Sequence, residues 1–313
     1  MRFLDFFRNL ALLLVLGLAQ LGFGASSPEP SIDVNSMAIL YNSNDAESKN
    51  LAEDYAKARS IPTNHLVGLP LPDSEEITRQ QYNDTLAEPL RAEFDKRQWW
   101  NRGKSADGII LAGNNKIRIL VTMKGVPLKI AREAPSTTAP TPNTAAGDKN
   151  AATPPTENPM LLANEASVDS ELALISVEPL PLNGPSNNPY FKSDKPFASS
   201  NFPFMMLVGR IDAANYQTCH RLIRDAIQAE QTGLWGRAYF DIANKYPEGD
   251  MWMRIAGAKT EAAGFPVMYN LSDEVFTKYF PFTDTAIYYG WYEPHVNGPF
   301  INPDFHFRTG AIA

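Results

Sequence analysis

The sequence predicts an α/β protein in which a mostly parallel sheet is covered by helices on both faces. Short apolar runs rich in β-branched residues alternate with longer stretches of helical periodicity along most of the chain. Alternation of this kind favours parallel strands, because each helix returns the chain to the start of the next strand. A chain of 313 residues can bury a large core, and we expect residues 33–313 to form a single α/β domain.

The first strand–helix unit lies in residues 36–62. "SMAILYN" (residues 36–42) predicts a strand, and Asn44 can cap the helix that follows, with Glu47 three residues on as in a capping box. Three apolar residues then share one helical face: Leu51, Tyr55 and Ala58. Pro62 ends this helix.

Further elements follow up to residue 133. The pattern predicts a strand at 65–69, a helix over 77–100 with a kink at Pro89, and strands within 107–111 and 116–130. Residues 133–160 break the pattern, because Pro, Ala and Thr supply six residues each of these 28. Such a segment buries too little apolar surface to offset its ordering entropy, so we expect a disordered insert that interrupts the domain.

The alternation resumes after the insert. We expect a helix at 171–175, a buried strand at 202–211, a helix over 212–233 ended by Gly233, a strand at 236–243, a helix at 251–264, a strand at 266–270, a short helix at 272–280 and a strand at 286–289. Residues 307–313 read as the beginning of one more strand, so we expect the chain to be incomplete at its C-terminus.

The N-terminus has the pattern of an export signal. Arg2 and Arg8 precede a 13-residue apolar run at 10–22, interrupted only by Gln20, and small residues follow. This run is short for a membrane-spanning helix, which needs roughly 20 apolar residues. We therefore expect a signal peptide at residues 1–24 and a mature chain in the periplasm or at the cell surface, with an uncleaved anchor as the alternative.

Charge and cysteine content exclude several classes of function. The formal charge is -7, and loss of Arg2, Arg8 and Asp5 with the signal makes it -8, which argues against nucleic acid as a partner. A single cysteine, Cys219, allows no internal disulfide and no zinc site built on paired cysteines. The sequence has no phosphate-binding glycine loop and no known hydrolase motif, so we expect no cofactor and no metal.

Candidate site residues come from the rule that ligands bind beyond the carboxyl ends of parallel strands. The predicted strands place five binding candidates and one catalytic candidate there: Asp169, Arg210, Asp241, Trp291 and Tyr292 for binding, and His295 for catalysis. Simpler roles compete with these. Asn44 and Asp45 can be helix caps, Asp169 and Ser170 can cap the next helix, and Arg210 can pair with Asp169 or Asp241. Cys219 shares an apolar helical stripe and is expected in the core.

Residues 204–243, "FMMLVGRIDAANYQTCHRLIRDAIQAEQTGLWGRAYFDIA", resemble the gingipain-type cysteine peptidases of the caspase-like superfold. That family has a strand ending in Gly-Arg, a helix closing in an acidic residue and a strand ending in Asp. The matching positions here are Gly209-Arg210, Glu230 and Asp241. The resemblance implies a caspase-like fold from about residue 167 onward.

A second resemblance spans nearly all of residues 36–313. The stretches "ILYNSNDAESKNLAEDYAKARSIP", "LVTMKGVPLKI", "SVDSELALI", "VGRI" and "YYGWYEP" are similar to an uncharacterised family of exported bacterial proteins found with the exosortase (PEP-CTERM) sorting system. This resemblance implies export but supplies no activity.

The gingipain resemblance also bears on catalysis. In that family the strand matching "AIYY" ends in Gly-His-Gly, whose histidine assists a cysteine at the end of the next strand. Here Gly290 is kept, but Trp291 stands where that histidine would be. We therefore expect a catalytically degenerate domain that binds a peptide or polysaccharide of the cell envelope, as a binding or assembly factor linked to export or exopolysaccharide. The alternatives are a hydrolase with a rearranged site, in which His295 is the base, and a fragment that is not a functional unit.

Overall fold

The computed structural model describes residues 33–133, 163–193, 195–291 and 295–313. The predicted signal peptide, nearly all of the predicted insert and Tyr292 lie outside the described residues. Within the described part, no helix is both long enough and apolar enough to cross a membrane.

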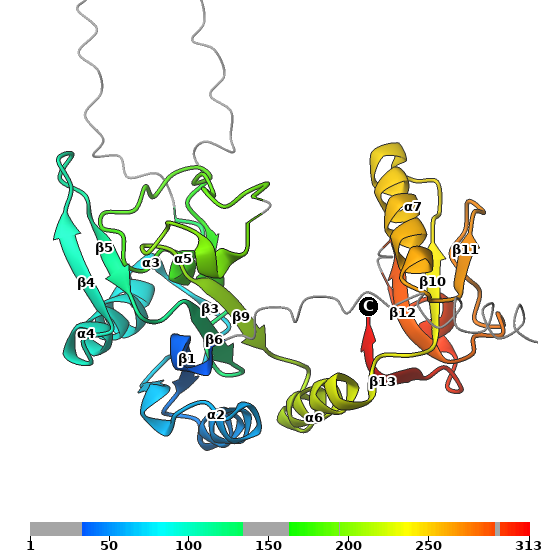
Figure 1. Cartoon of the computed structure of the whole chain (residues 1–313), viewed down its shortest axis with the longest axis horizontal. Helices are drawn as coiled ribbons and strands as arrows, with labels where there is room; N and C mark the ends of the chain where they lie inside the picture. Colours follow the sequence, from blue (N-terminus) through cyan, green and yellow to red (C-terminus); the bar gives the residue numbers. More distant parts are fainter. Residues whose placement is uncertain (1–32, 134–162, 194, 292–294) are drawn as a thin grey trace, which may run out of the picture.

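Two four-stranded parallel sheets organise the described chain (Figure 1). The first sheet has the order β2-β1-β6-β9, from strands β1 (Met37–Asn42), β2 (Leu66–Leu69), β6 (Ile119–Met123) and β9 (Leu207–Ile211). The second has the order β11-β10-β12-β13, from strands β10 (Arg237–Asp241), β11 (Val267–Asn270), β12 (Thr285–Gly290) and β13 (Phe307–Ile312). The predicted α/β class with parallel strands is confirmed, and the strands are divided between two sheets that share one internal order.

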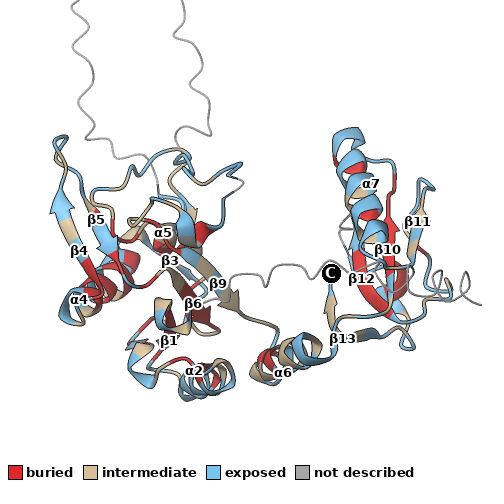
Figure 2. Ribbon diagram, in the orientation of Figure 1, coloured by how far each residue is buried: buried red, intermediate tan, exposed pale blue. Residues whose placement is uncertain are grey.

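The first sheet is covered on both faces. Helices α2 (Ala46–Arg59) and α6 (Tyr216–Thr232) cover one face, and α4 (Glu88–Lys96) and α5 (Val168–Ala173) cover the other. Alternate residues of β1 point into the two cores, so Ile39 packs with α2 and Leu40 packs with α4. Figure 2 shows the buried residues concentrated in the strands between these helices.

Strand β9 differs from its prediction. The sequence predicts a buried strand, but β9 is an edge strand and all five of its residues are exposed or half-buried. Its apolar residues predict burial. However, β9 pairs along one edge with β6, and at its other edge no strand of the described chain covers it.

Helix α2 begins one residue later than predicted. Asp45 is the N-cap, and its carboxylate accepts hydrogen bonds from the backbone N–H groups of Glu47 and Ser48. Asn44 donates instead from its amide to the carbonyl of Leu71. Asn44 as the cap is therefore wrong, because a contact 27 residues along the chain takes its side chain away from the helix.

The predicted helix over residues 77–100 is divided into three parts. A short turn α3 (Arg79–Gln81) leads into a π-helical turn (Tyr82–Ala87), which leads into α4. Pro89 has no N–H to donate to the preceding turn, and its ring would crowd a carbonyl there. The wider π turn directly before Pro89 accommodates this defect, so the helix is interrupted next to the proline at which the sequence predicts a kink.

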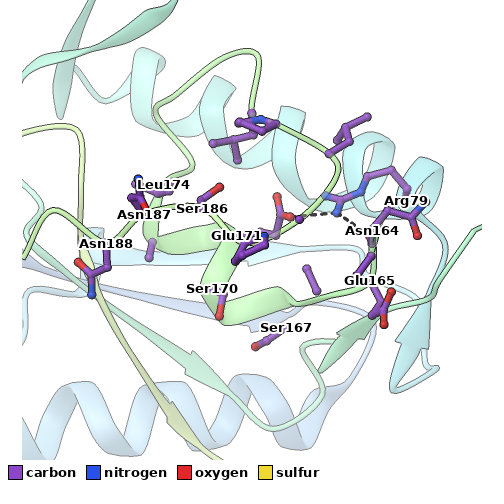
Figure 3. A pocket seen from close by; sticks show the side chains of 18 of the residues that line it. Arg79, Asn164, Glu165, Ser167, Ser170, Glu171, Leu174, Ser186, Asn187 and Asn188 are labelled. Carbon is purple, nitrogen blue, oxygen red and sulfur yellow. Dashed lines mark hydrogen bonds and ion pairs between the residues drawn. The ribbon is translucent and has the colours of Figure 1, made fainter. Parts of the chain in front are cut away.

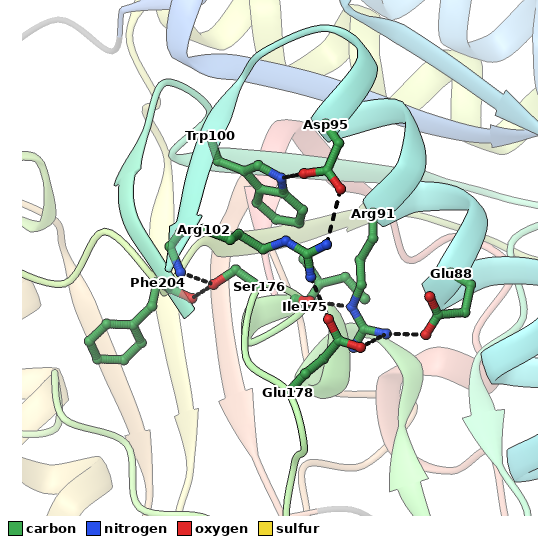
Figure 4. Close-up of polar contacts among 10 residues, drawn as sticks. Glu88, Arg91, Asp95, Trp100, Arg102, Ile175, Ser176, Glu178 and Phe204 are labelled. Atoms are coloured by element: carbon green, nitrogen blue, oxygen red, sulfur yellow. Dashed lines mark hydrogen bonds and ion pairs between the residues drawn. The ribbon is translucent and has the colours of Figure 1, made fainter. Parts of the chain in front are cut away.

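A small sheet and a hairpin complete the first half. Strands β3 (Glu76–Ile77), β7 (Lys129–Ile130) and β8 (Ala166–Ser167) form the small sheet, with β8 at its edge, and β4 (Trp100–Lys104) pairs with β5 (Ile110–Asn115) as the hairpin. A charged network joins the hairpin to α4 and to the segment after α5 (Figure 4). Arg102 bonds to Asp95 at 3.0 Å and also to Glu178, while Arg91 donates to the Ile175 carbonyl at 2.8 Å. These contacts fix the chain where it leaves α5.

The two faces of the second sheet are covered differently. Helix α7 (Pro247–Ala262) covers that face, and phenylalanines from the 271–284 segment cover the other. The helix predicted at 272–280 is absent, since this segment is a series of turns and bends. The Asn270 carboxamide oxygen accepts from both the N–H and the hydroxyl of Ser272, so side chains satisfy the backbone groups that a helix would have paired.

Candidate functional site

The strand order identifies one switch point in each sheet. In the first sheet, β2 lies on one side of β1 and β6 on the other, and in the second sheet β11 and β12 flank β10 in the same way. The crevices therefore lie between β1 and β6 and between β10 and β12. Asp241 and Trp291 lie at the carboxyl ends of β10 and β12, whereas Arg210 lies in β9 of the first sheet and Asp169 in α5 beside it. The structure therefore brings the predicted residues together as two groups, one for each sheet.

Arg210 and Asp169 form a bidentate ion pair. Arg210 Nε and Nη2 donate to the two carboxylate oxygens at 2.8 and 2.7 Å. The same guanidinium donates to the carbonyls of Val126 at 2.8 Å and Pro127 at 3.0 Å. Asp169 lies inside the first turn of α5 and Ser167 occupies the N-cap position, so the predicted capping role of Asp169 is wrong. The pair fastens α5 and the 126–127 turn to the end of β9.

The first switch point is filled by side chains. Ser48 donates from its hydroxyl to the Lys124 carbonyl at 2.6 Å and accepts from the Asn42 backbone at 3.1 Å. Tyr216 donates to the Asp45 carboxylate and to the Lys124 carbonyl, and its pKa is raised by burial and by the Asp45 hydrogen bond. Sequence spacing gave no signal for this cluster, because Asp45 and Tyr216 are 171 residues apart. The arrangement holds the ends of β1 and β6 together.

Cys219 lies under the first switch point and is fully buried. It packs with Leu51, Val121 and Met123 from α2 and β6, as the apolar stripe predicts. Burial raises the pKa of the thiol, and the nearby Asp212 adds to this effect. A protonated, enclosed thiol is a poor nucleophile.

Alkylation of Cys219 is therefore expected to be slow in the folded protein. Iodoacetamide at neutral pH should label native Cys219 at least about a hundredfold more slowly than the urea-unfolded chain, because reaction requires local opening of the core. Mass spectrometry of timed samples measures the two rates. Equal rates would contradict the buried position.

Asp241 is buried at the second switch point and has three hydrogen-bond donors. Its carboxylate accepts from Asn270 Nδ2 at 2.8 Å, from the Phe276 backbone at 2.9 Å and from the Tyr288 hydroxyl at 2.7 Å. Burial, followed by the hydrogen bond to Asp241, raises the pKa of Tyr288 well above its usual range. The carboxylate joins β10, β11, β12 and the phenylalanine-rich segment.

Trp291 packs against the start of α7. Its Nε1 donates to the Asp250 carboxylate at 2.6 Å, and its ring meets Tyr246 edge-on with a 4.8 Å centroid separation. A side chain at Gly249 would overlap the indole, so the helix approaches the ring closely at this glycine. Trp291 is thus a packed residue at the carboxyl edge. His295 is exposed, and among the described residues it contacts neither a cysteine nor a carboxylate.

A pocket lies beside α5 (Figure 3). Its volume is about 430 Å³, within the range typical of ligand sites. One wall carries an ion pair between Arg79 and Glu171 at 2.9 Å, with side chains 12% and 13% exposed. We call this cavity the α5 pocket; it is lined chiefly by residues 163–167, 170–174, 180–189, Arg79 and Met205.

Several polar groups of the α5 pocket lack an internal partner. In the described chain, the hydroxyls of Ser167, Ser170 and Ser186 make no hydrogen bond to protein atoms. Leu174, Leu180 and Met205 supply apolar surface between them. None of these residues was a candidate site residue in the sequence, because the pocket lies beside α5 and not beyond the carboxyl end of a predicted strand.

Strand β8 presents a free edge in this pocket. The N–H of Lys129 donates to the Glu75 carbonyl at 3.1 Å and that of Ala131 to the Ile77 carbonyl of β3 at 2.8 Å, so Ile130 between them faces β8 and pairs with Ala166. The next residue of β8, Ser167, then directs its N–H away from β7, while its carbonyl, at the N-cap of α5, accepts the first hydrogen bond of that helix. A lining strand with an unpaired edge can accept one more strand.

The chain matches no protein-family model, no curated protein and no solved structure. Fold and site together define it as an α/β protein with two parallel sheets, a polar pocket beside α5 and internally bonded switch points.

Proposed function

We propose that this chain is an exported binding factor of the cell envelope, with a caspase-like α/β fold, that holds an extended segment of another polypeptide. The observation that carries the proposal is the free edge of β8 in the α5 pocket. The main-chain N–H of Ser167 would donate a hydrogen bond to an added strand, and the apolar surface of Leu174 and Met205 would select side chains.

The state of the predicted site residues supports binding over hydrolysis. Arg210, Asp169 and Asp241 use their charges in internal hydrogen bonds, and Trp291 is bonded to Asp250. A general base must lie within hydrogen-bond distance of the group whose proton it removes, such as a nucleophilic side chain. His295 has no such neighbour among the described residues.

Export rests on the N-terminal sequence. The basic start and the short apolar run of residues 1–24 support secretion, and the likeness to exosortase-associated proteins supports a place in the envelope. An envelope binding factor would meet polypeptides in transit there.

Replacing Ser167 with proline tests the binding mode. Ser167 has φ -68°, which proline adopts without strain, and the residue before it is already extended. Proline removes the N–H at the free edge, so affinity for peptides selected from a random twelve-residue phage library should fall at least tenfold, or about 1.4 kcal/mol. Fluorescence polarisation measures the affinity, and circular dichroism checks that the fold is kept.

The matched control is Ser167→Ala, which removes the hydroxyl and keeps the N–H. Affinity should stay within about twofold of the unchanged protein, because backbone pairing is retained. Equal affinity of the proline and alanine variants would refute docking at β8, and failure to select any peptide would refute the proposed function.

A further inference from the structure

A second pocket lies on the second sheet, far along the chain from the α5 pocket. Its volume is about 450 Å³, and its walls are the segments 278–282 and 301–305. We call it the aromatic pocket; its ring-bearing residues are Tyr279, Phe280, Phe282 and Phe305. It takes no part in the peptide binding proposed above.

Ring packing makes the walls of this pocket rigid. Phe280 and Phe282 lie 4.9 Å apart between centroids, and Phe282 meets Phe305 edge-on at 5.2 Å. Asn302 joins the two segments, donating to the Lys278 carbonyl at 2.9 Å and accepting from the Asp304 N–H at 3.0 Å. A ligand would meet surfaces that are already in place.

The rim combines an open ring with unused polar groups. Tyr279 is 81% exposed, so its ring is accessible to a ligand. In the described part of the chain, the Asp304 carboxylate has no hydrogen-bond donor, and the Lys278 ammonium contacts only the Tyr279 ring, 4.7 Å from its centroid. One cation and one anion leave the rim without net charge.

We propose that the aromatic pocket binds a neutral sugar residue of a polysaccharide. A pyranose ring has an apolar C–H face, which stacks on an aromatic ring, and hydroxyls at its edge, which bond to carboxylate and ammonium groups. The pocket offers both kinds of group within one rigid frame. A purely apolar ligand would leave Asp304 and Lys278 desolvated without partners, which is costly. An anionic sugar would face the Asp304 carboxylate.

Titration of the full mature chain with oligosaccharides tests this site. The probes are cellotetraose, maltotetraose and chitotetraose, with dextran sulfate as the anionic comparison, and NMR line broadening of the sugar reports binding. We expect at least one neutral probe to bind, and Tyr279→Ala to weaken it at least tenfold. Asp304→Ala should weaken the same probe severalfold.

Matched controls separate this site from the other. Phe191 is 71% exposed and outside the aromatic pocket, so Phe191→Ala should leave sugar binding unchanged. Ser167→Pro should also leave it unchanged, so failure here and failure of peptide binding are distinguishable. Absence of binding by all three neutral probes, tighter binding of dextran sulfate, or equal binding by Tyr279→Ala would each overturn the assignment.

Discussion

Asp241→Ala is expected to lower the free energy of unfolding by about 3–5 kcal/mol. Asp241 is 1% exposed and its carboxylate accepts hydrogen bonds from Asn270, Phe276 and Tyr288, so its loss leaves the Phe276 N–H and the Tyr288 hydroxyl without acceptors and takes one of two acceptors from the Asn270 amide. Each orphaned group costs its own desolvation penalty. Urea unfolding followed by tryptophan fluorescence measures the change.

Two companion variants calibrate this result. Tyr288→Phe removes one donor and leaves the carboxylate with two, so it should cost about 1–2 kcal/mol. Asp304→Ala, at an exposed position, should change stability by less than about 0.5 kcal/mol. If Asp241→Ala kept full stability and abolished a measured activity, Asp241 would be a functional residue and its structural role would be refuted.

Arg210→Met is expected to cost about 2–3 kcal/mol. Removal leaves the Asp169 carboxylate without its cation, and the carbonyls of Val126 and Pro127 without a donor. Fully buried pairs lose more on truncation, but these side chains are 14% and 28% exposed, so solvent screens part of the loss. Urea unfolding again gives the free energy.

A double-mutant cycle isolates the pair itself. Asp169→Asn combined with Arg210→Met should cost less than the sum of the two single changes, because no unpaired charge remains. Arg210→Lys keeps the charge but cannot donate along both carboxylate oxygens, so it should lie between the native protein and Arg210→Met. A coupling free energy near zero would show that the observed bidentate geometry adds nothing to stability.

Local periodicity was sufficient to predict most of the elements. The helices α2, α6 and α7 and the strands of both sheets lie where apolar spacing places them. These errors arise where side-chain hydrogen bonds compete with the local pattern. Asn44 bonds to the distant Leu71 in place of capping, and Asn270 accepts from the backbone and hydroxyl of Ser272, two residues on, where a helix was predicted. Apolar periodicity carries no signal for either contact.

The sequence predicted where the candidate site residues lie, but it did not predict what their side chains do. Asp241 and Trp291 do lie at carboxyl ends of strands, since parallel order fixes that edge. Their bonding to Tyr288 and Asp250 depends on partners 47 and 41 residues away. The α5 pocket could not be predicted, because apolar periodicity does not show that Arg79 lies beside residues 163–189 and Met205.

Helix α6 belongs to two neighbours at once. Cys219 and Ile223 seal one core of the first sheet, while Ala229 lies against Gly310 of β13. An ion pair between Arg59 and Glu230 joins α2 to the C-terminal end of α6. A cut directly after β9 would remove α6 from the first half and expose the core that α6 covers. A cut at Gly233 would keep that core covered and would expose only the surface of the second half that contacts α6. To express the two halves separately, the chain should therefore be cut in the short connection after Gly233, so that α6 stays with the first half.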